Sequence, residues 1–124
     1  MSQSVKDFEK TLNAAADLSA KQFFIAKVDT SGNADLAALA TNALIGVIQN
    51  KPQSGEGALI RFGGTSKVKL GGTVTAGAWC TSDTAGKGVA TTTDKDTVIG
   101  RFLEAGVSGD VVEVQLGIFT LSAT

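Results

Sequence analysis

The feature that most constrains the fold of this chain is an internal repeat without gaps, in which residues 44–63 recur as residues 98–117. The glycines that recur at one constant spacing are Gly46 with Gly100, Gly55 with Gly109, and Gly63 with Gly117. Each copy reads as a strand, a glycine-containing turn and a second strand. Two copies are too few for a solenoid. The repeat therefore favours two related β-hairpins in a pseudo-symmetric barrel or sandwich.

The second strand of each copy alternates between apolar and polar side chains, cleanly in the later copy and more loosely in the earlier one. The apolar positions are Val112, Val114 and Leu116 in the later copy, and Ala58, Ile60 and Phe62 in the earlier copy. Alternation of this kind predicts a strand with one face buried.

Further strands are expected outside the repeat, because residues 66–70 and 73–80 also alternate. With 15 glycines and one proline, the chain suits short strands joined by tight turns. We predict a mostly β fold, a small barrel or sandwich of about seven to nine short antiparallel strands.

Residues 1–20 differ from the rest, because they lack glycine and proline. Val5, Phe8, Leu12 and Ala16 follow one another at helical spacing, which predicts a weak amphipathic helix. This helix could pack on its own domain, dock on a neighbouring subunit, or fray as a terminus. We divide the chain into a helical or extended arm, 1–20, and a single β domain, 21–124, that contains the hairpins 44–63 and 98–117.

The residues needed for common catalytic chemistry are missing, since the chain has no histidine and no tyrosine. Cys80 is its one cysteine and lies on an alternating apolar face, so we expect it to be buried. Residues 86–88 resemble the end of a phosphate-binding loop but lack the flanking glycine and hydroxyl. Residues 29–40 resemble a calcium loop but have Ala34 in place of its glycine and Ala40 in place of its glutamate. We therefore expect no enzyme, no cofactor and no metal site.

Charge and hydropathy exclude two further classes of protein. With 11 basic and 12 acidic residues, the net charge is -1, so we expect no nucleic-acid binding. The apolar stretch 36–50 is short and interrupted, so we expect no membrane span. Residues 1–7 do not have the pattern of a secretory signal, so we expect the protein to be synthesised in a cytoplasm.

Trp79 is the strongest candidate for a binding contact. It lies on the face opposite Cys80, together with Thr73, Thr75 and Gly77, and such a polar face usually meets solvent. Tryptophan is enriched at binding hot spots. Trp79 could instead cover one end of the core. The candidate interface residues are Val5, Phe8, Leu12 and Trp79.

The order of these features resembles the small capsid decoration proteins of tailed bacteriophages, also called cement or head-stabilisation proteins. The stretches that carry the resemblance are 44–47, 72–77, 81–90, 98–106 and 109–116, within residues 43–117. The resemblance implies a non-enzymatic protein on the exterior of a virion capsid. It implies two partners, the major capsid protein and further copies of the chain. For the copies of the chain, it favours a homotrimer over a dimer.

Two other functions fit the same sequence. The chain could be another phage structural component, such as a head-fibre base, a tail-tube component or a head–tail adaptor. It could also be a small-ligand or carbohydrate-binding β-module, in which Trp79 would stack on the ligand.

Overall fold

The structure is a computed structural model that describes residues 8–122. Ten β-strands form nearly all of its regular structure: β1 (Glu9–Asn13), β2 (Ile25–Val28), β3 (Ala34–Leu36), β4 (Leu44–Ile48), β5 (Gly57–Arg61), β6 (Thr65–Lys69), β7 (Trp79–Ser82), β8 (Gly88–Thr91), β9 (Thr97–Phe102) and β10 (Val111–Thr120). The strands form two five-stranded antiparallel sheets. The prediction of a mostly β, sandwich-like fold is confirmed, with ten strands rather than seven to nine.

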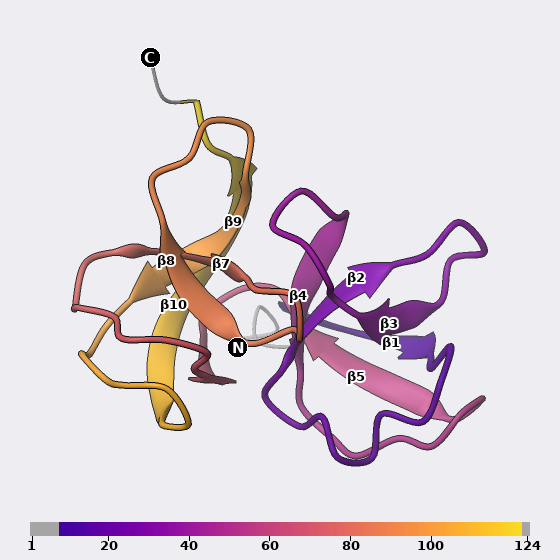
Figure 1. The fold of residues 1–124 in the computed structure, drawn as a ribbon. Coiled ribbons are helices and arrows are strands. Elements are labelled where there is room, and N and C mark those ends of the chain that lie inside the picture. Colours follow the sequence, from indigo (N-terminus) through magenta and orange to yellow (C-terminus); the bar gives the residue numbers. More distant parts are fainter. Residues whose placement is uncertain (1–7, 123–124) are drawn as a thin grey trace, which may run out of the picture.

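Figure 1 shows the sheets as two neighbouring lobes. We call strands β1–β5 lobe 1 and strands β6–β10 lobe 2. The strand order is β1-β5-β4-β2-β3 in lobe 1 and β6-β10-β9-β7-β8 in lobe 2. These are the same order, with each strand of lobe 2 five places later in the order of strands along the chain. The internal repeat therefore extends from one hairpin to a whole five-stranded unit.

The pairing register is repeated as well. In lobe 1, Ile25 pairs with Val47, and in lobe 2, Trp79 pairs with Arg101, at the same spacing that separates Gly46 from Gly100. The first strand of each lobe follows a slightly longer spacing, so that Lys10 opposite Ile60 corresponds to Ser66 opposite Val114. Residues of the two lobes can therefore be compared position by position.

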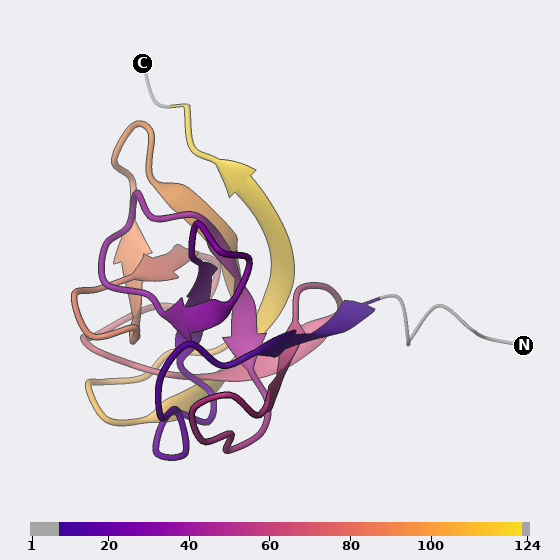
Figure 2. The same ribbon diagram turned by 90° about the vertical axis from the view of Figure 1, so that its right-hand side faces the viewer.

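Each sheet curls on itself, because a single backbone bridge joins its two end strands. The bridges are Ala14 with Ala34 in lobe 1 and Leu70 with Gly88 in lobe 2. Figure 2 shows that β10 is a long, curved strand that leads towards the C-terminal end. Its last residues, 117–120, are exposed.

The core is shared between the lobes. Lobe 1 has its own buried cluster, which includes Phe24, Ile48 and Ile60. The larger cluster is centred on lobe 2 but also contains Ile25 and Val47 from lobe 1. The outer face of β2 and β4 is thus the surface by which lobe 1 packs on lobe 2.

The N-terminal segment departs from the prediction. The helical interpretation is wrong for Glu9–Asn13, because these residues form β1 and pair with β5. The extended alternative fits this stretch. Ala14 and Leu18, which follow it, are buried in the core of lobe 1. Backbone pairing with β5, together with the burial of Ala14 and Leu18, overrides the weak helical periodicity. Val5 lies outside the described residues.

The predicted strand over residues 73–80 is also shorter than expected. Regular pairing begins at Trp79, and Val74 makes only an isolated bridge with Gly106. A turn centred on Gly77 precedes β7. Within the described residues, no helix is long and apolar enough to cross a membrane.

Candidate interaction surfaces

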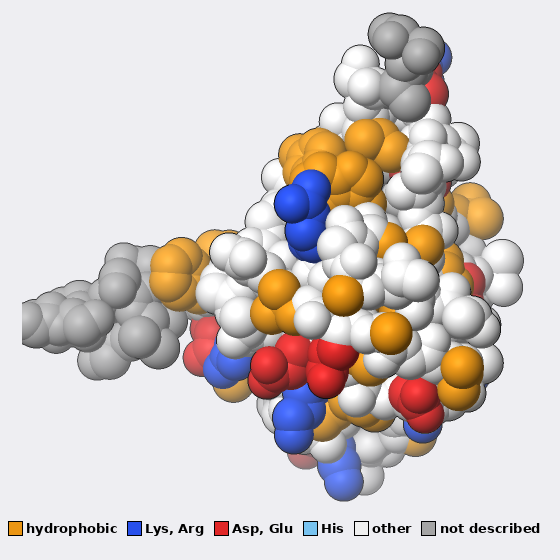
Figure 3. All heavy atoms as spheres, turned by 90° about the vertical axis from the view of Figure 1, so that its left-hand side faces the viewer, with side chains coloured by type: hydrophobic (Ala, Val, Ile, Leu, Met, Phe, Trp, Pro, Cys, Tyr) orange, Lys and Arg blue, Asp and Glu red, His pale blue; other side chains and the backbone are white. Residues whose placement is uncertain are grey.

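The aromatic surface of lobe 2 is built by β7, β9 and β10. Trp79 lies edge-to-face against Phe119, with ring centroids 5.0 Å apart, and the guanidinium carbon of Arg101 lies 4.0 Å from the Trp79 ring centroid. Figure 3 shows a basic side chain against a hydrophobic patch on this side of the molecule. The three side chains border a shallow hollow of about 310 Å³. We call this surface the Trp79 face.

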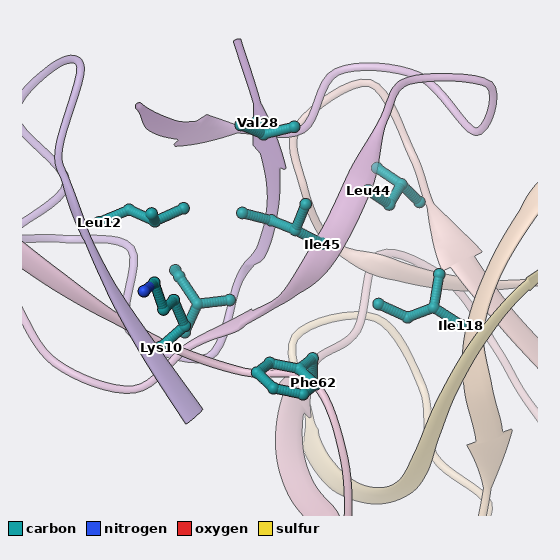
Figure 4. Close-up of a pocket in the computed structure, with 8 residues that line it drawn as sticks. Lys10, Leu12, Val28, Leu44, Ile45, Phe62 and Ile118 are labelled. Carbon is teal, nitrogen blue, oxygen red and sulfur yellow. The ribbon is translucent and has the colours of Figure 1, made fainter. Parts of the chain in front are cut away.

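A second surface, the apolar groove, lies on lobe 1 beside β10. It has a volume of about 350 Å³ and is lined by Lys10, Leu12, Val28, Leu44, Ile45, Ile60, Phe62 and Ile118. Figure 4 shows Leu12 and Ile45 pointing towards one another across it, with Phe62 and Ile118 along its border. Among the described residues that line the groove, only Lys10 is charged. An open, almost wholly apolar hollow is suited to an apolar side chain of a partner.

The predicted interface residues do not form one site. Leu12 lines the apolar groove, whereas Trp79 lies on the other lobe. Phe8 is 39% exposed and borders a third hollow with Arg61 and residues 63–65. Phe62, Ile118 and Phe119 also line these surfaces, and the sequence prediction did not include them. The alternation placed Phe62 on a buried face, but it is 37% exposed.

Features relevant to chemistry are few. Cys80 is fully buried, as predicted, and burial raises the pKa of its thiol far above the ordinary value. Between residues 8 and 122, no group of three or more His, Cys, Asp or Glu residues is placed to hold a metal ion. The segment that failed as a calcium loop is a turn, in which Asp29 Oδ1 accepts hydrogen bonds from the N–H groups of Ser31 and Asn33. That the chain is not an enzyme stays a prediction.

Comparisons with known proteins give a match at the level of fold. No protein-family model matches the chain, and no curated protein sequence matches it. Among solved structures, the chain is similar to the N base of head fiber gp8.5 of bacteriophage phi29, with a TM-score of 0.68 and 15% sequence identity. The similarity covers 88% of this chain and 92% of the phi29 chain. The two proteins therefore share nearly the whole two-lobed fold.

Proposed function

We propose that this chain is a non-enzymatic structural component of a bacteriophage virion, with a role on the head surface like that of a head-fibre base. The observation that carries this proposal is the fold match to the head-fibre base, which spans 92% of that chain. The resemblance of residues 43–117 to capsid decoration proteins points independently to the outside of a phage head.

The surface of the chain suits such a role. Its net charge of -1 avoids strong repulsion between densely placed copies. Exposed apolar side chains, among them Leu103, Val107 and Val111, are available for contacts with other proteins. The major capsid protein is the partner that this role requires.

A gold-labelled antibody against the chain, applied to virions of the encoding phage, tests the proposal. We expect label on the head. Label on the tail would reassign the chain to a tail structure, and absence of the protein from purified virions would refute a structural role. Virions stripped by protease serve as the control for antibody specificity.

A decoration function is the second candidate, supported by the sequence resemblance. It differs from a base function in its effect on the shell. Heads that lack a cement protein should break at lower temperature or low salt, whereas heads that lack a fibre base should be as stable as complete heads. Heating the two kinds of head in parallel, with release of DNA as the readout, separates the two functions.

A further inference from the structure

The contact between the two lobes is asymmetric. Lobe 1 supplies a surface, which we call the donor face, and lobe 2 supplies the surface that receives it. Ile25 and Val47 of lobe 1 are fully buried and join the core cluster of lobe 2. Backbone hydrogen bonds fix this contact. The Ile25 N–H donates to the Gly86 carbonyl at 2.7 Å, and the Lys69 N–H donates to the Phe23 carbonyl at 2.9 Å.

The same position on lobe 2 is the Trp79 face. Trp79 corresponds to Ile25, and Arg101 corresponds to Val47, because the two pairs occupy the same register. Ile25 and Val47 are covered by the neighbouring lobe, whereas Trp79 is half-buried and Arg101 is exposed. The surface of lobe 2 that is equivalent to the donor face of lobe 1 is therefore exposed to solvent.

The surface that receives the donor face is covered in lobe 2 and open in lobe 1. Val68, Ile99 and Leu116 of lobe 2, together with Ser66, are buried where Ile25 and Val47 pack. The corresponding residues of lobe 1 are Leu12, Ile45, Phe62 and Lys10, and all four line the apolar groove. The groove is therefore the receiving surface of lobe 1, filled in lobe 2 and open in lobe 1.

A third position agrees with this correspondence. Gly86, which accepts the hydrogen bond from Ile25, is buried, and a β-carbon there would lie 2.4 Å from Leu36 of the docked lobe. Its counterpart in lobe 1, Gly32, is exposed, with nothing within 4 Å of its β-carbon position.

We propose that the Trp79 face of one copy of this chain docks into the apolar groove of a second copy, and so repeats between molecules the contact that joins the lobes within one. Each copy carries one donor face and one receiving groove, so the contact is head-to-tail. Such contacts generate a closed ring when the rotation closes and an open chain when it does not. Trp79 and Phe119 supply large apolar area to an almost wholly apolar groove.

This inference goes beyond the proposed function and does not depend on it, because it concerns self-association in solution. Two variants remove one side each. Trp79→Ala removes the donor side chain, and Phe62→Lys places a second positive charge beside Lys10 in the groove. Both side chains are at least partly exposed, so the fold should survive. Val107→Ala, at an exposed residue that lines neither surface, is the matched control.

Sedimentation velocity of the purified full chain should show oligomers for the unchanged protein and for Val107→Ala. Each single variant should associate at least about tenfold more weakly. An equimolar mixture of the two variants should form one-to-one dimers, because Phe62→Lys retains the donor face and Trp79→Ala retains the groove. This recovery also shows that both variants are folded. The proposal is overturned if the unchanged protein is monomeric, if the single variants assemble as it does, or if the mixture stays monomeric.

Discussion

A β-carbon on Gly46 would lie 2.3 Å from the carbonyl oxygen of Arg61, on the neighbouring strand β5. The second lobe repeats this relationship, since a β-carbon on Gly100 would lie 2.1 Å from the carbonyl oxygen of Gln115. The obstacle in both cases is backbone, which cannot move without disturbing the sheet. The glycine of the Ile-Gly step in each repeat copy is thus a steric requirement of the β4–β5 and β9–β10 pairs.

Gly46→Ala and Gly100→Ala should each lower the free energy of unfolding by more than about 2 kcal/mol. Gly117→Ala is the control, because nothing lies within 4 Å of its β-carbon position, and it should change stability by less than about 0.5 kcal/mol. Urea unfolding measures all three. Equal stability of the Gly46 and Gly117 variants would show that the strands separate easily at this position.

Replacement of Phe23 by glycine should destabilise the protein less than replacement by alanine. Its φ of 70° lies in the left-handed region, and its counterpart Gly77 has a φ of 92°. The N–H groups of both residues donate to equivalent carbonyls, those of Ile48 and Phe102, at 2.7 Å. Both replacements lose the phenyl ring, but alanine retains the backbone strain.

We therefore expect Phe23→Gly to be more stable than Phe23→Ala by about 1 kcal/mol, the reverse of the usual order. Thermal unfolding of the two variants measures the difference. Gly77→Ala provides the matched comparison and should be destabilised by a similar amount. The opposite ranking at position 23 would mean that the left-handed backbone is not strained there.

The two lobes contain the same aspartate-centred turn, and the variants Asp29→Ala and Asp83→Ala compare its contribution to stability. Oδ1 of Asp83 accepts hydrogen bonds from the N–H groups of Ala85 and Lys87, as Asp29 does in lobe 1 from its own following residues. The second turn also holds the Gly86 carbonyl that accepts the hydrogen bond from Ile25.

Asp29→Ala should cost about 1 kcal/mol, and Asp83→Ala should cost more. Asparagine at either position retains the acceptor oxygen and should cost less than alanine. Urea titration of the four variants measures these differences. A larger loss at position 29 would contradict the role assigned to the Gly86 turn in joining the lobes.

Cys80 should be unreactive in the folded protein. Burial raises the pKa of its thiol, so the reactive thiolate is scarce at neutral pH, and reagents cannot reach the side chain. Labelling with a thiol reagent, followed by mass spectrometry, should require urea. Rapid labelling without urea would show that β7 opens easily.

The sequence predicted the parts of the fold that have strong local patterns. The alternation of Val112 and Val114 matches β10, and the match of Gly46 to Gly100 marked one repeated hairpin. It did not predict that the repeat includes all five strands, because the earlier strands have diverged in side-chain type. Ile25 and Trp79 occupy one position of the fold and share no local pattern. The sequence Asp-Thr-X-Gly, which occurs at Asp29 and again at Asp83, is the local pattern that indicates the longer repeat.

The candidate site was predicted only in part. Helical spacing selects Leu12 and a polar strand face selects Trp79, and the structure places Leu12 in the apolar groove of lobe 1 and Trp79 on the exposed face of lobe 2. Their relationship follows from which face of each lobe is covered by the other, and this depends on tertiary packing. Residues 9–13 show the same limit, since backbone pairing with β5 decides their conformation.

The head-to-tail contact is tested most directly by a disulfide between copies. Within the chain, the Gln49 side-chain amide donates to the Ser66 hydroxyl across the lobes at 2.8 Å. The corresponding residues are Leu103 and Lys10, both exposed. The Leu103→Cys and Lys10→Cys variants, mixed and oxidised gently, should form disulfide-linked dimers that neither variant forms alone. Dimers of Leu103→Cys with itself, or no cross-linking in the mixture, would contradict the contact.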